Sequence, residues 1–296
     1  MPKQENVELT WKSNCLLGES PIWCDNTQSL FFIDIVGKKI LRWKDSHKKD
    51  FYTTSKEPGS IVLSNQSGTI LCAMEHELCS VYLNKDNFSY KTHFIFNELK
   101  ENRMNDGKCD PAGRFWVASM NKTCQDNSGK VWRINRDFSC KEMIGGFSVG
   151  NGFGWNPEGT IMYFTDSEKR VIYSYMYDLS TGDLGARSVF AKIPIILGKP
   201  DGLAVDSDGF VWSAHWDGWR VTRYQPDGKI DRVIKMPVPR PTSIAFGGKD
   251  LDILFITSAS VGLRKKDITN APLSGSLFSL KLDTAGLRSY SFGEEG

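Results

Sequence analysis

The sequence predicts an all-β fold, a six-bladed β-propeller, on three observations. Two short apolar segments joined by a polar turn form a pair that recurs six times, at a spacing of about 40 to 50 residues, the range of a four-stranded propeller blade. The second segment of each pair is rich in β-branched and aromatic residues, which are favoured in strands. No apolar stripe with the 3.6-residue period of a helix lies between the pairs, which argues against the alternative, a doubly wound α/β fold.

The six pairs follow one another along the chain in the same layout. They are 20–23 with 30–34, 60–63 with 69–74, 106–110 with 115–119, 151–155 with 162–166, 201–205 with 211–214, and 242–246 with 253–258. A third segment of similar character follows four of them, at 39–43, 130–134, 171–175 and 220–224. The pairs fill the 296 residues, so we expect a single domain over 1–296 whose closed ring leaves no long free strand edge.

The turn Pro200-Asp201-Gly202 shows how such a segment begins. Proline fixes its own φ angle and glycine tolerates conformations that other residues avoid, so the aspartate between them has little backbone freedom. Taken alone, it is explained equally well as an ordinary turn aspartate. The same layout recurs at the start of other units, and this recurrence favours a functional role.

Composition and charge exclude several classes of protein. The chain has 37 Lys and Arg against 35 Asp and Glu, a net charge of +2, and its basic residues are scattered, so we expect no nucleic-acid-binding or membrane-binding face. Residues 1–6 lack the apolar core of a signal peptide, and no later stretch is apolar enough to span a bilayer, so we expect a cytoplasmic protein. The seven cysteines are odd in number and contain no C-x-x-C pair, which disfavours a disulfide framework and a cysteine-ligated zinc site.

The propeller geometry brings residues that are distant in sequence to one place. The first strand of each blade lines the central channel, so the starts of these strands converge on one axis. The polar residues at those starts are Glu19, Arg103, Asn105, Asp106, Asn151, Asp201 and Thr242. Glu19, Asn151 and Asp201 offer two carboxylates and one amide oxygen, a set suited to calcium, magnesium or manganese and usable by zinc or ferrous iron. Each is also a common turn residue, so their coincidence at equivalent repeat positions is what favours a metal site.

Several short motifs also occur in a fixed order from about Gly18 to near the C-terminus. They are Gly18-Glu19-Ser20-Pro21, Asn102-Arg103-Met104-Asn105-Asp106-Gly107-Lys108, Asp110-Pro111-Ala112-Gly113-Arg114, Gly150-Asn151-Gly152, Pro200-Asp201-Gly202, and Phe246-Gly247-Gly248 with Ile256-Thr257-Ser258-Ala259. As a set they resemble the signature segments of the senescence-marker-protein, or regucalcin/gluconolactonase, family. The resemblance implies a six-bladed propeller with one divalent metal in its channel that hydrolyses a sugar lactone to the aldonic acid.

Carried over position by position, the resemblance makes Glu19, Asn151 and Asp201 the metal ligands, and Arg103 and Asn105 substrate-binding residues. We assign the adjacent Asp106 to the same substrate-binding group. Asp201 also matches the family's proposed general base, and whether Asp201 or a metal-bound hydroxide activates the attacking water stays open. We therefore expect a metal-dependent lactonase that acts as a monomer on a small-molecule sugar lactone.

The chain departs from the family after Met120. Animal members carry there a glutamate-containing loop that touches the sugar, whereas this chain has Asn121-Lys122-Thr123-Cys124-Gln125-Asp126, so the sugar preference is open. Residues 214–219 look more like bacterial aldonolactonases of the family, which favours a catabolic enzyme. A second class of function is a non-catalytic calcium-binding or small-molecule-binding propeller of the regucalcin type. Arg103, Asn105 and Asp201 offer more than a bare ion site needs, which favours the enzyme.

Two other patterns have plainer explanations. His76 and His215 follow second strands of their units, but without a placed partner a hydrogen-bonded surface or core histidine is the better interpretation. The stretch Gly146-Phe147-Ser148-Val149-Gly150 fits the G-x-S-x-G nucleophile elbow, which requires a strand, a sharp turn and a helix. A β repeat follows here instead, so a serine hydrolase is disfavoured.

Overall fold

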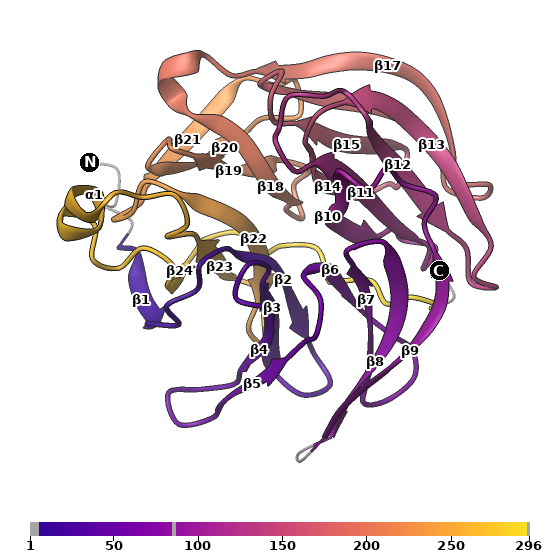
Figure 1. Ribbon diagram of the computed structural model, residues 1–296. Helices are drawn as coiled ribbons and strands as arrows, with labels where there is room; N and C mark the ends of the chain where they lie inside the picture. The colour runs from indigo at the N-terminus through magenta and orange to yellow at the C-terminus, as the bar shows by residue number, and fades with distance from the viewer. Residues whose placement is uncertain (1–5, 85–86, 295–296) are drawn as a thin grey trace.

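The computed structural model describes residues 6–84 and 87–294, and within them the strands form six four-stranded antiparallel sheets (Figure 1). The sheets follow one another around the molecule in chain order, from indigo through magenta to orange in Figure 1. Their innermost strands contact one another in a closed cycle, β2–β6–β10–β14–β18–β22 and back to β2. The predicted six-bladed β-propeller is confirmed.

Each blade runs from the channel outward through four strands. The innermost strands are β2 (Gly18–Cys24), β6 (Pro58–Leu63), β10 (Asn102–Cys109), β14 (Gly150–Trp155), β18 (Lys199–Val205) and β22 (Pro241–Gly247). The second strands are β3 (Ser29–Asp34), β7 (Thr69–Met74), β11 (Phe115–Asn121), β15 (Ile161–Asp166), β19 (Val211–Trp216) and β23 (Ile253–Ser258). The third strands are β4 (Lys39–Trp43), β8 (Glu77–Asn84), β12 (Gly129–Ile134), β16 (Val171–Asp178), β20 (Arg220–Tyr224) and β24 (Leu277–Lys281). The outermost strands are β5 (Lys49–Thr53), β9 (Asn87–Ile95), β13 (Cys140–Phe147), β17 (Asp183–Lys192), β21 (Ile230–Lys235) and, in the sixth blade, β1 (Glu8–Trp11).

The sixth blade closes the ring with both ends of the chain. Its strand order is β1-β24-β23-β22, so a strand from the N-terminus completes a sheet built by the C-terminal third of the sequence. Leu9 pairs with Phe278 and Trp11 with Leu277, and Figure 1 shows the indigo β1 beside the gold β24. The sequence repeat does not predict this pairing, because β1 is only four residues long and stands apart from its partners in sequence.

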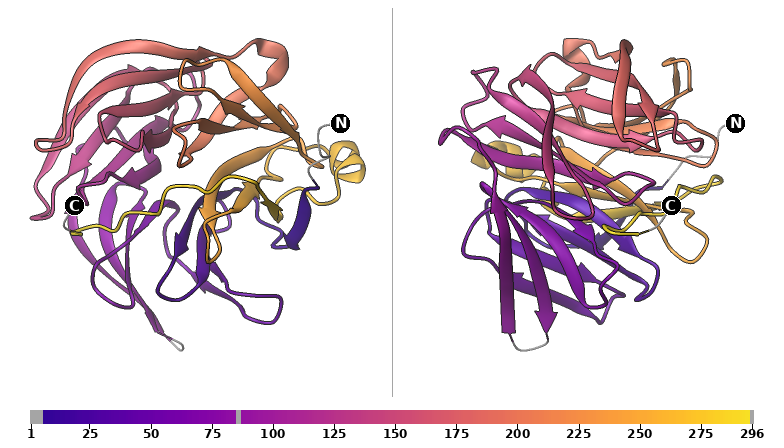
Figure 2. Two further views of the ribbon diagram at one scale, coloured as in Figure 1. Left: turned by 180° about the vertical axis from the view of Figure 1, so that it is seen from behind. Right: turned by 90° about the vertical axis from the view of Figure 1, so that its right-hand side faces the viewer.

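The segment after β24 runs across one end of the channel, as the yellow trace in Figure 2 shows. Besides the bond from Gly286 N to Leu251 O in the sixth blade, its backbone bonds to three other blades: Leu287 N donates to Val205 O, Phe292 N to Leu63 O, and Gly293 N to Gly113 O. The strap formed by residues 283–294 thereby covers the end of the channel opposite to the strand starts. The predicted site lies at the other, uncovered end.

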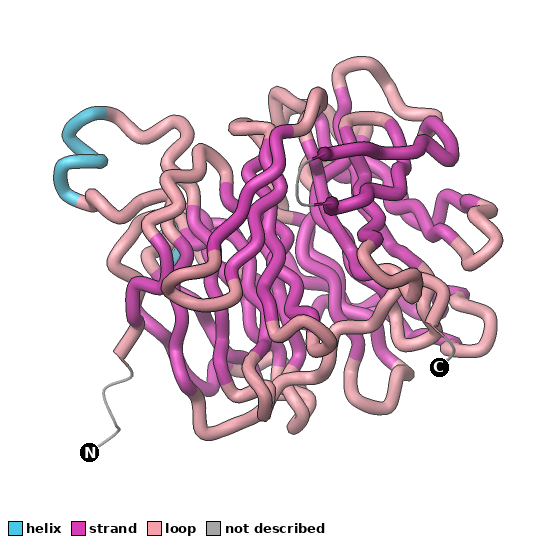
Figure 3. Tube along the Cα trace, turned by 90° about the horizontal axis from the view of Figure 1, so that it is seen from below, coloured by secondary structure: helices cyan, strands magenta, loops and turns pink. Residues whose placement is uncertain are grey.

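Helix is confined to connections between strands, where Figure 3 shows it in cyan. A 3₁₀ turn spans Ile195–Leu197 and a six-residue α-helix, α1, spans Lys265–Asn270. No helix in the described part of the chain is long and apolar enough to cross a membrane. From residues 1–6 we expect no signal peptide. Of these, residues 1–5 lie outside the described residues.

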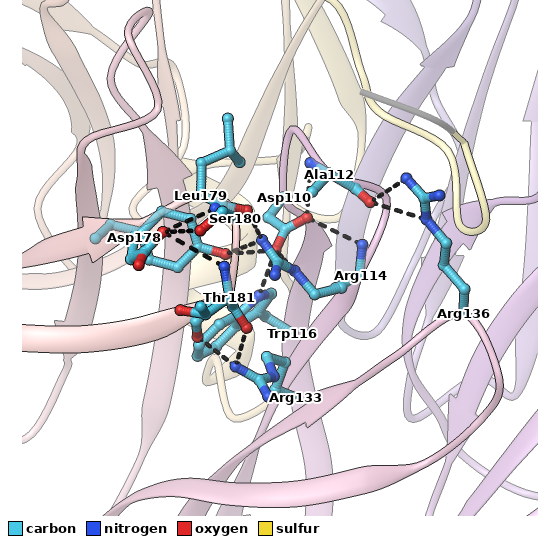
Figure 4. A network of polar contacts seen from close by, with 12 residues as sticks. Asp110, Ala112, Arg114, Trp116, Arg133, Arg136, Asp178, Leu179, Ser180 and Thr181 are labelled. Carbon is cyan, nitrogen blue, oxygen red and sulfur yellow. Dashed lines mark hydrogen bonds and ion pairs between the residues drawn. The ribbon is translucent and has the colours of Figure 1, made fainter.

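The Asp110-Pro-Ala-Gly-Arg114 motif is a structural joint between the third and fourth blades (Figure 4). Asp110 Oδ2 accepts hydrogen bonds from Arg114 Nε at 2.6 Å, from Trp116 Nε1 at 3.0 Å and from the hydroxyl of Tyr177. Arg114 Nη2 donates to Leu179 O at 2.6 Å. Asp110 is fully buried, and its three donors satisfy a charge that would otherwise be costly there.

Substitution of Asp110 by Ala is expected to lower the free energy of unfolding by about 3–5 kcal/mol, because it leaves the Arg114 charge buried and unpaired. Chemical denaturation measures the effect. Asp137→Ala in the same blade is the control, since Asp137 lies in an exposed turn and bonds only Ser139 among the described residues, so its loss should change the free energy of unfolding far less than the loss of Asp110. Equal losses for the two variants would show that the joint does not stabilise the blades.

Candidate active site

Each innermost strand carries a break in its register with the second strand at the same relative position. The breaks fall between Glu19 and Ile22, Pro58 and Ser60, Met104 and Gly107, Asn151 and Phe153, Pro200 and Leu203, and Pro241 and Ile244. The predicted site residues at these breaks are Glu19, Asn105, Asp106, Asn151 and Asp201. A β-bulge frees its residues from the ladder and turns their side chains away from the sheet face. The recurrence seen in the sequence is therefore a ring of bulges around the channel.

Gly152 shows why glycine is needed at such a bulge. Its φ is +31°, in the region that L side chains rarely adopt. A Cβ added there would lie 2.6 Å from the carbonyl oxygen of Asp201 and 2.5 Å from Thr165 Oγ1. The backbones of β14 and β18 thus approach closely at this point, which brings Asn151 and Asp201 together.

A cavity of about 210 Å³ lies at the strand starts. Five predicted residues line it: Glu19, Arg103, Asn105, Asn151 and Asp201. Asp106 does not line this cavity. It lines a smaller one of about 70 Å³ farther along the channel, with Lys108 and residues 287–290 of the strap. The geometry brings together the expected metal ligands and two of the three expected substrate-binding residues, and it places Asp106 behind them.

Three carboxylates of this region, Glu19, Asp106 and Asp201, are almost completely buried, and Lys108 is the cation beside Asp106. Burial raises the pKa of Glu19 well above its usual value, and the charges of Asp201 and Asp106 raise it further. Burial and then the charge of Asp106 do the same to the pKa of Asp201. Arg103 is the nearby cation that opposes both shifts. Such a group of carboxylates is stabilised by a bound cation, which lowers the free energy of their ionised forms.

Asn151 is the third member of the donor set. Its Nδ2 donates to Asp201 Oδ1 and, at 3.3 Å, to Ser167 Oγ, and its Oδ1 accepts from the backbone N–H of Gly152. An amide that turns over presents its oxygen in place of its nitrogen, so the same contact can serve a cation. No cluster of three or more His, Cys, Asp or Glu side chains suited to a metal occurs in 6–84 and 87–294. A site here therefore depends on the amide of Asn151, and the all-oxygen set fits a hard divalent ion.

Arg103 and Asn105 form a fixed pair on the same wall. Arg103 Nη1 donates to Asn105 Oδ1 at 2.8 Å and to Met104 O at 2.9 Å, and Asn105 Nδ2 donates to Gly150 O at 3.0 Å. Arg103 Nε lies 4.0 Å from a carboxylate oxygen of Glu57. These contacts hold Arg103, which is 9% exposed, at the cavity, where the remaining N–H groups of its guanidinium can donate to a carbonyl or ester oxygen.

The cavity also contains residues to which the sequence analysis assigned no individual role in the site. They are Leu17, Met120, Cys124, Val149, Ser167, Glu168, Lys199 and Trp216. Cys124 and Trp216 belong to the segments 121–126 and 214–219 that we compared with the family, and Met120 directly precedes the first of these segments. These lining residues lie at the ends of second strands or just before innermost strands, on the same face of the propeller as the bulges. Position in the repeat could have identified them, but their residue types vary from blade to blade and carry no motif.

His76, His215 and Ser148 do not line this cavity. His215 is fully buried, and its Nδ1 contacts Leu197 O at 2.8 Å while its ring stacks on Tyr224. Burial lowers the pKa of His215 to about 4, so it is neutral at physiological pH. His76 Nε2 contacts Asn102 O at 2.7 Å. Both histidines have the hydrogen-bonded role expected of them. Ser148 lies between β13 and β14, with no helix after it, as the β repeat predicted.

Known proteins of similar sequence and structure complete this description. The model of the SMP-30/gluconolactonase/LRE-like region matches residues 17–260. Regucalcin from Bos taurus is 31% identical over 293 residues, which cover 97% of this chain and 98% of that protein. A luciferin-regenerating enzyme superposes with a TM-score of 0.91 at 26% identity, over 97% of this chain and 99% of that one. A calcium-binding protein, regucalcin, from Agrobacterium tumefaciens superposes with a TM-score of 0.92 at 24% identity, over 98% of both chains, which shows a shared fold.

Proposed function

This chain belongs to the SMP-30/gluconolactonase/LRE-like family, and we propose that it is a lactonase that opens a lactone ring by hydrolysis with the help of one divalent cation. The supporting observation is the convergence of Glu19, Asn151 and Asp201 with Arg103 in one cavity. Carboxylates and an amide would hold the cation, and the guanidinium would hold the ester. A site for an ion alone does not need the fixed Arg103–Asn105 pair.

Hydrolysis of a lactone requires a water to attack the ester carbonyl and lose a proton, while the carbonyl oxygen gains negative charge. A cation held by Glu19, Asn151 and Asp201 would supply Lewis-acid polarisation of the carbonyl. Arg103 donates hydrogen bonds to the oxygen on which charge develops. Asp201 accepts the proton of the attacking water and returns it to the ring oxygen when the carbon–oxygen bond breaks, which yields a hydroxy acid.

The test is acid release from a panel of sugar and simple lactones, by the chelated protein and after addition of calcium, magnesium, manganese, zinc or ferrous iron. Hydrolysis of at least one lactone with one of these ions is the expected result. A protein that binds calcium at this site and hydrolyses none of the lactones would instead be a non-catalytic binding propeller. Because turnover and ion binding are measured separately, the two functions give different results.

Substitution of Arg103 by Ala is expected to lower kcat/KM for lactones by about tenfold or more, equivalent to at least about 1.4 kcal/mol of transition-state stabilisation. Arg187→Ala is the matched control, since Arg187 stacks over Tyr173 on the outer strands, far from the channel in the blade order. The control should keep the native kcat/KM. If Arg103→Ala is equally active, the ester binds on another wall of the cavity.

A further inference from the structure

The wall of the active-site cavity is divided by chemistry. Its lining contains two chemically different groups of residues, and we call Glu19, Asn151, Asp201, Arg103 and Asn105 the polar floor. We call Leu17, Met120, Val149 and Trp216 the apolar wall. Met120 and Val149 are buried and lie side by side, paired across a β-bridge between the third and fourth blades.

Several polar groups of the cavity already have hydrogen-bond partners within the protein. Arg103, Asn105 and Ser167 each donate to a neighbouring backbone carbonyl. Lys199 Nζ donates to Glu168 at 2.5 Å, and these two side chains are 33% and 29% exposed. These contacts use part of the hydrogen-bonding capacity of the cavity, so fewer donors and acceptors remain for the hydroxyl groups of a ligand.

This distribution discriminates between two kinds of lactone. A sugar lactone carries several hydroxyl groups besides its ester, and each needs a partner when it leaves water. A lactone with an alkyl or aryl substituent needs only its ester to be bound, while its apolar part gains from contact with an apolar surface. The floor suits the ester in both cases, but the apolar wall suits only the second.

Two exposed apolar residues lie near the cavity in sequence. The segment Ile195–Leu197 immediately precedes Gly198, and Ile195 and Ile196 are 75% and 85% exposed. Gly198 has no room for a Cβ because Trp216 O, at the end of β19, would lie 2.4 Å from it, so the backbone at Gly198 approaches that of Trp216 closely.

We propose that the substrate of this site is a lactone with an apolar substituent, which lies on the apolar wall while its ester lies on the polar floor, rather than a polyhydroxylated sugar lactone. The inference rests on the proposed lactonase function and names the class of lactone that the cavity takes.

The experiment compares kcat/KM for γ- and δ-lactones with side chains of one to six carbons and for aldonolactones of the same ring sizes, in the presence of the activating cation. For each of the first methylenes buried, kcat/KM should rise by about two- to fourfold. The longer alkyl lactones should exceed the aldonolactones by more than tenfold.

Three variants locate the effect. Trp216→Ala should flatten the rise with chain length, and Met120→Gln, which keeps the length of the side chain, should lower the ratio of alkyl lactone to aldonolactone activity by at least threefold. Trp219→Ala is the control, because Trp219 is an exposed tryptophan three residues from Trp216 that does not line the cavity. It should keep the native rise, and circular dichroism of all three variants checks that they are folded.

Two failures are distinguishable. Faster hydrolysis of aldonolactones than of long-chain alkyl lactones, or a rise that Trp216→Ala and Met120→Gln leave intact, overturns the substrate class while the lactonase function stands. If no lactone is hydrolysed with any cation, the lactonase function fails. Calorimetric titration with non-hydrolysable alkyl lactams then decides the apolar preference: affinity that rises with chain length and depends on Trp216 supports it, and affinity independent of chain length overturns it.

Discussion

Chelation of divalent cations is expected to abolish lactone hydrolysis by this protein, and addition of one suitable cation is expected to restore it. Glu19 and Asp201 are buried, and burial together with neighbouring carboxylates raises the pKa of both. A cation held between their oxygens favours the ionised forms of both carboxylates and offsets the electrostatic repulsion between them. Acid release before chelation, after chelation and after add-back measures the effect. Full activity in a sample shown by elemental analysis to be metal-free would remove the cation from the mechanism.

Glu19→Gln tests which residues hold the ion. The amide keeps the shape of the carboxylate but removes one charge, so the affinity for the cation should fall and excess cation should partly restore turnover. Calorimetric titration of the ion gives the affinity independently of catalysis. Glu158→Gln is the control, since Glu158 bonds Asn156 in an exposed turn between β14 and β15. Unchanged ion affinity in Glu19→Gln would show that the ion binds elsewhere.

The sequence predicts the six blades because each strand pair carries its own signal. The innermost and second strands have apolar runs bounded by polar turns. An error of one residue in the predicted end of a strand does not change the number of blades that is predicted. The pairing of β1 with β24 could not be predicted, since it depends on the distance between the chain ends in the folded ring. The strap over the channel was missed for the same reason: residues 283–294 form backbone bonds to three other blades as well as to the sixth, without strand periodicity.

The sequence also predicts part of the candidate site, because some of the site residues recur with the blade repeat. Glu19 and Asn151 directly precede the register breaks of their strands and Asp201 lies within the break of its own, and the bulges place all three at one cavity. Asp106 follows Asn105 directly and lies in the same bulge, yet it lines the second, smaller cavity farther along the channel. Neighbouring residues in a bulge point in different directions, which explains the difference. Asp110 and Arg114, which belong to a motif of the family, serve the joint between blades. Asp206 stands at the corresponding turn of the fifth blade and accepts from Trp212 Nε1 and Arg223 Nε, each at 2.8 Å, within that one blade.

Asp201→Asn is expected to lower kcat by a factor on the order of 10² to 10⁴, the usual contribution of a general base. Asparagine keeps an oxygen at the same place and nearly the same shape, so the fold and much of the ion affinity should survive. What it loses is the ability to accept a proton from water. Turnover at saturating cation and lactone isolates this loss from any change in binding.

Asp208→Asn is the matched control for this change. Asp208 stands at the turn that follows β18, its side chain is 60% exposed, and it lies beyond the far end of the strand that carries Asp201. The same substitution there removes a surface charge without reaching the cavity. Its kcat should equal that of the native protein, so a loss confined to Asp201→Asn can be assigned to the site.

The role of general base places two opposed requirements on the carboxylate of Asp201. Burial and the nearby charge of Asp106 raise its pKa, which makes the ionised form a stronger base. The hydrogen bond from Asn151 opposes this rise, and a cation held beside the carboxylate would oppose it further by favouring the ionised form. A base needs both, ionisation before the reaction and affinity for a proton during it. Asp201→Asn that binds the cation normally and retains nearly native kcat would exclude Asp201 as the base. In that case Asp201 would serve only to hold the ion, and the proton of the attacking water would be lost by another route.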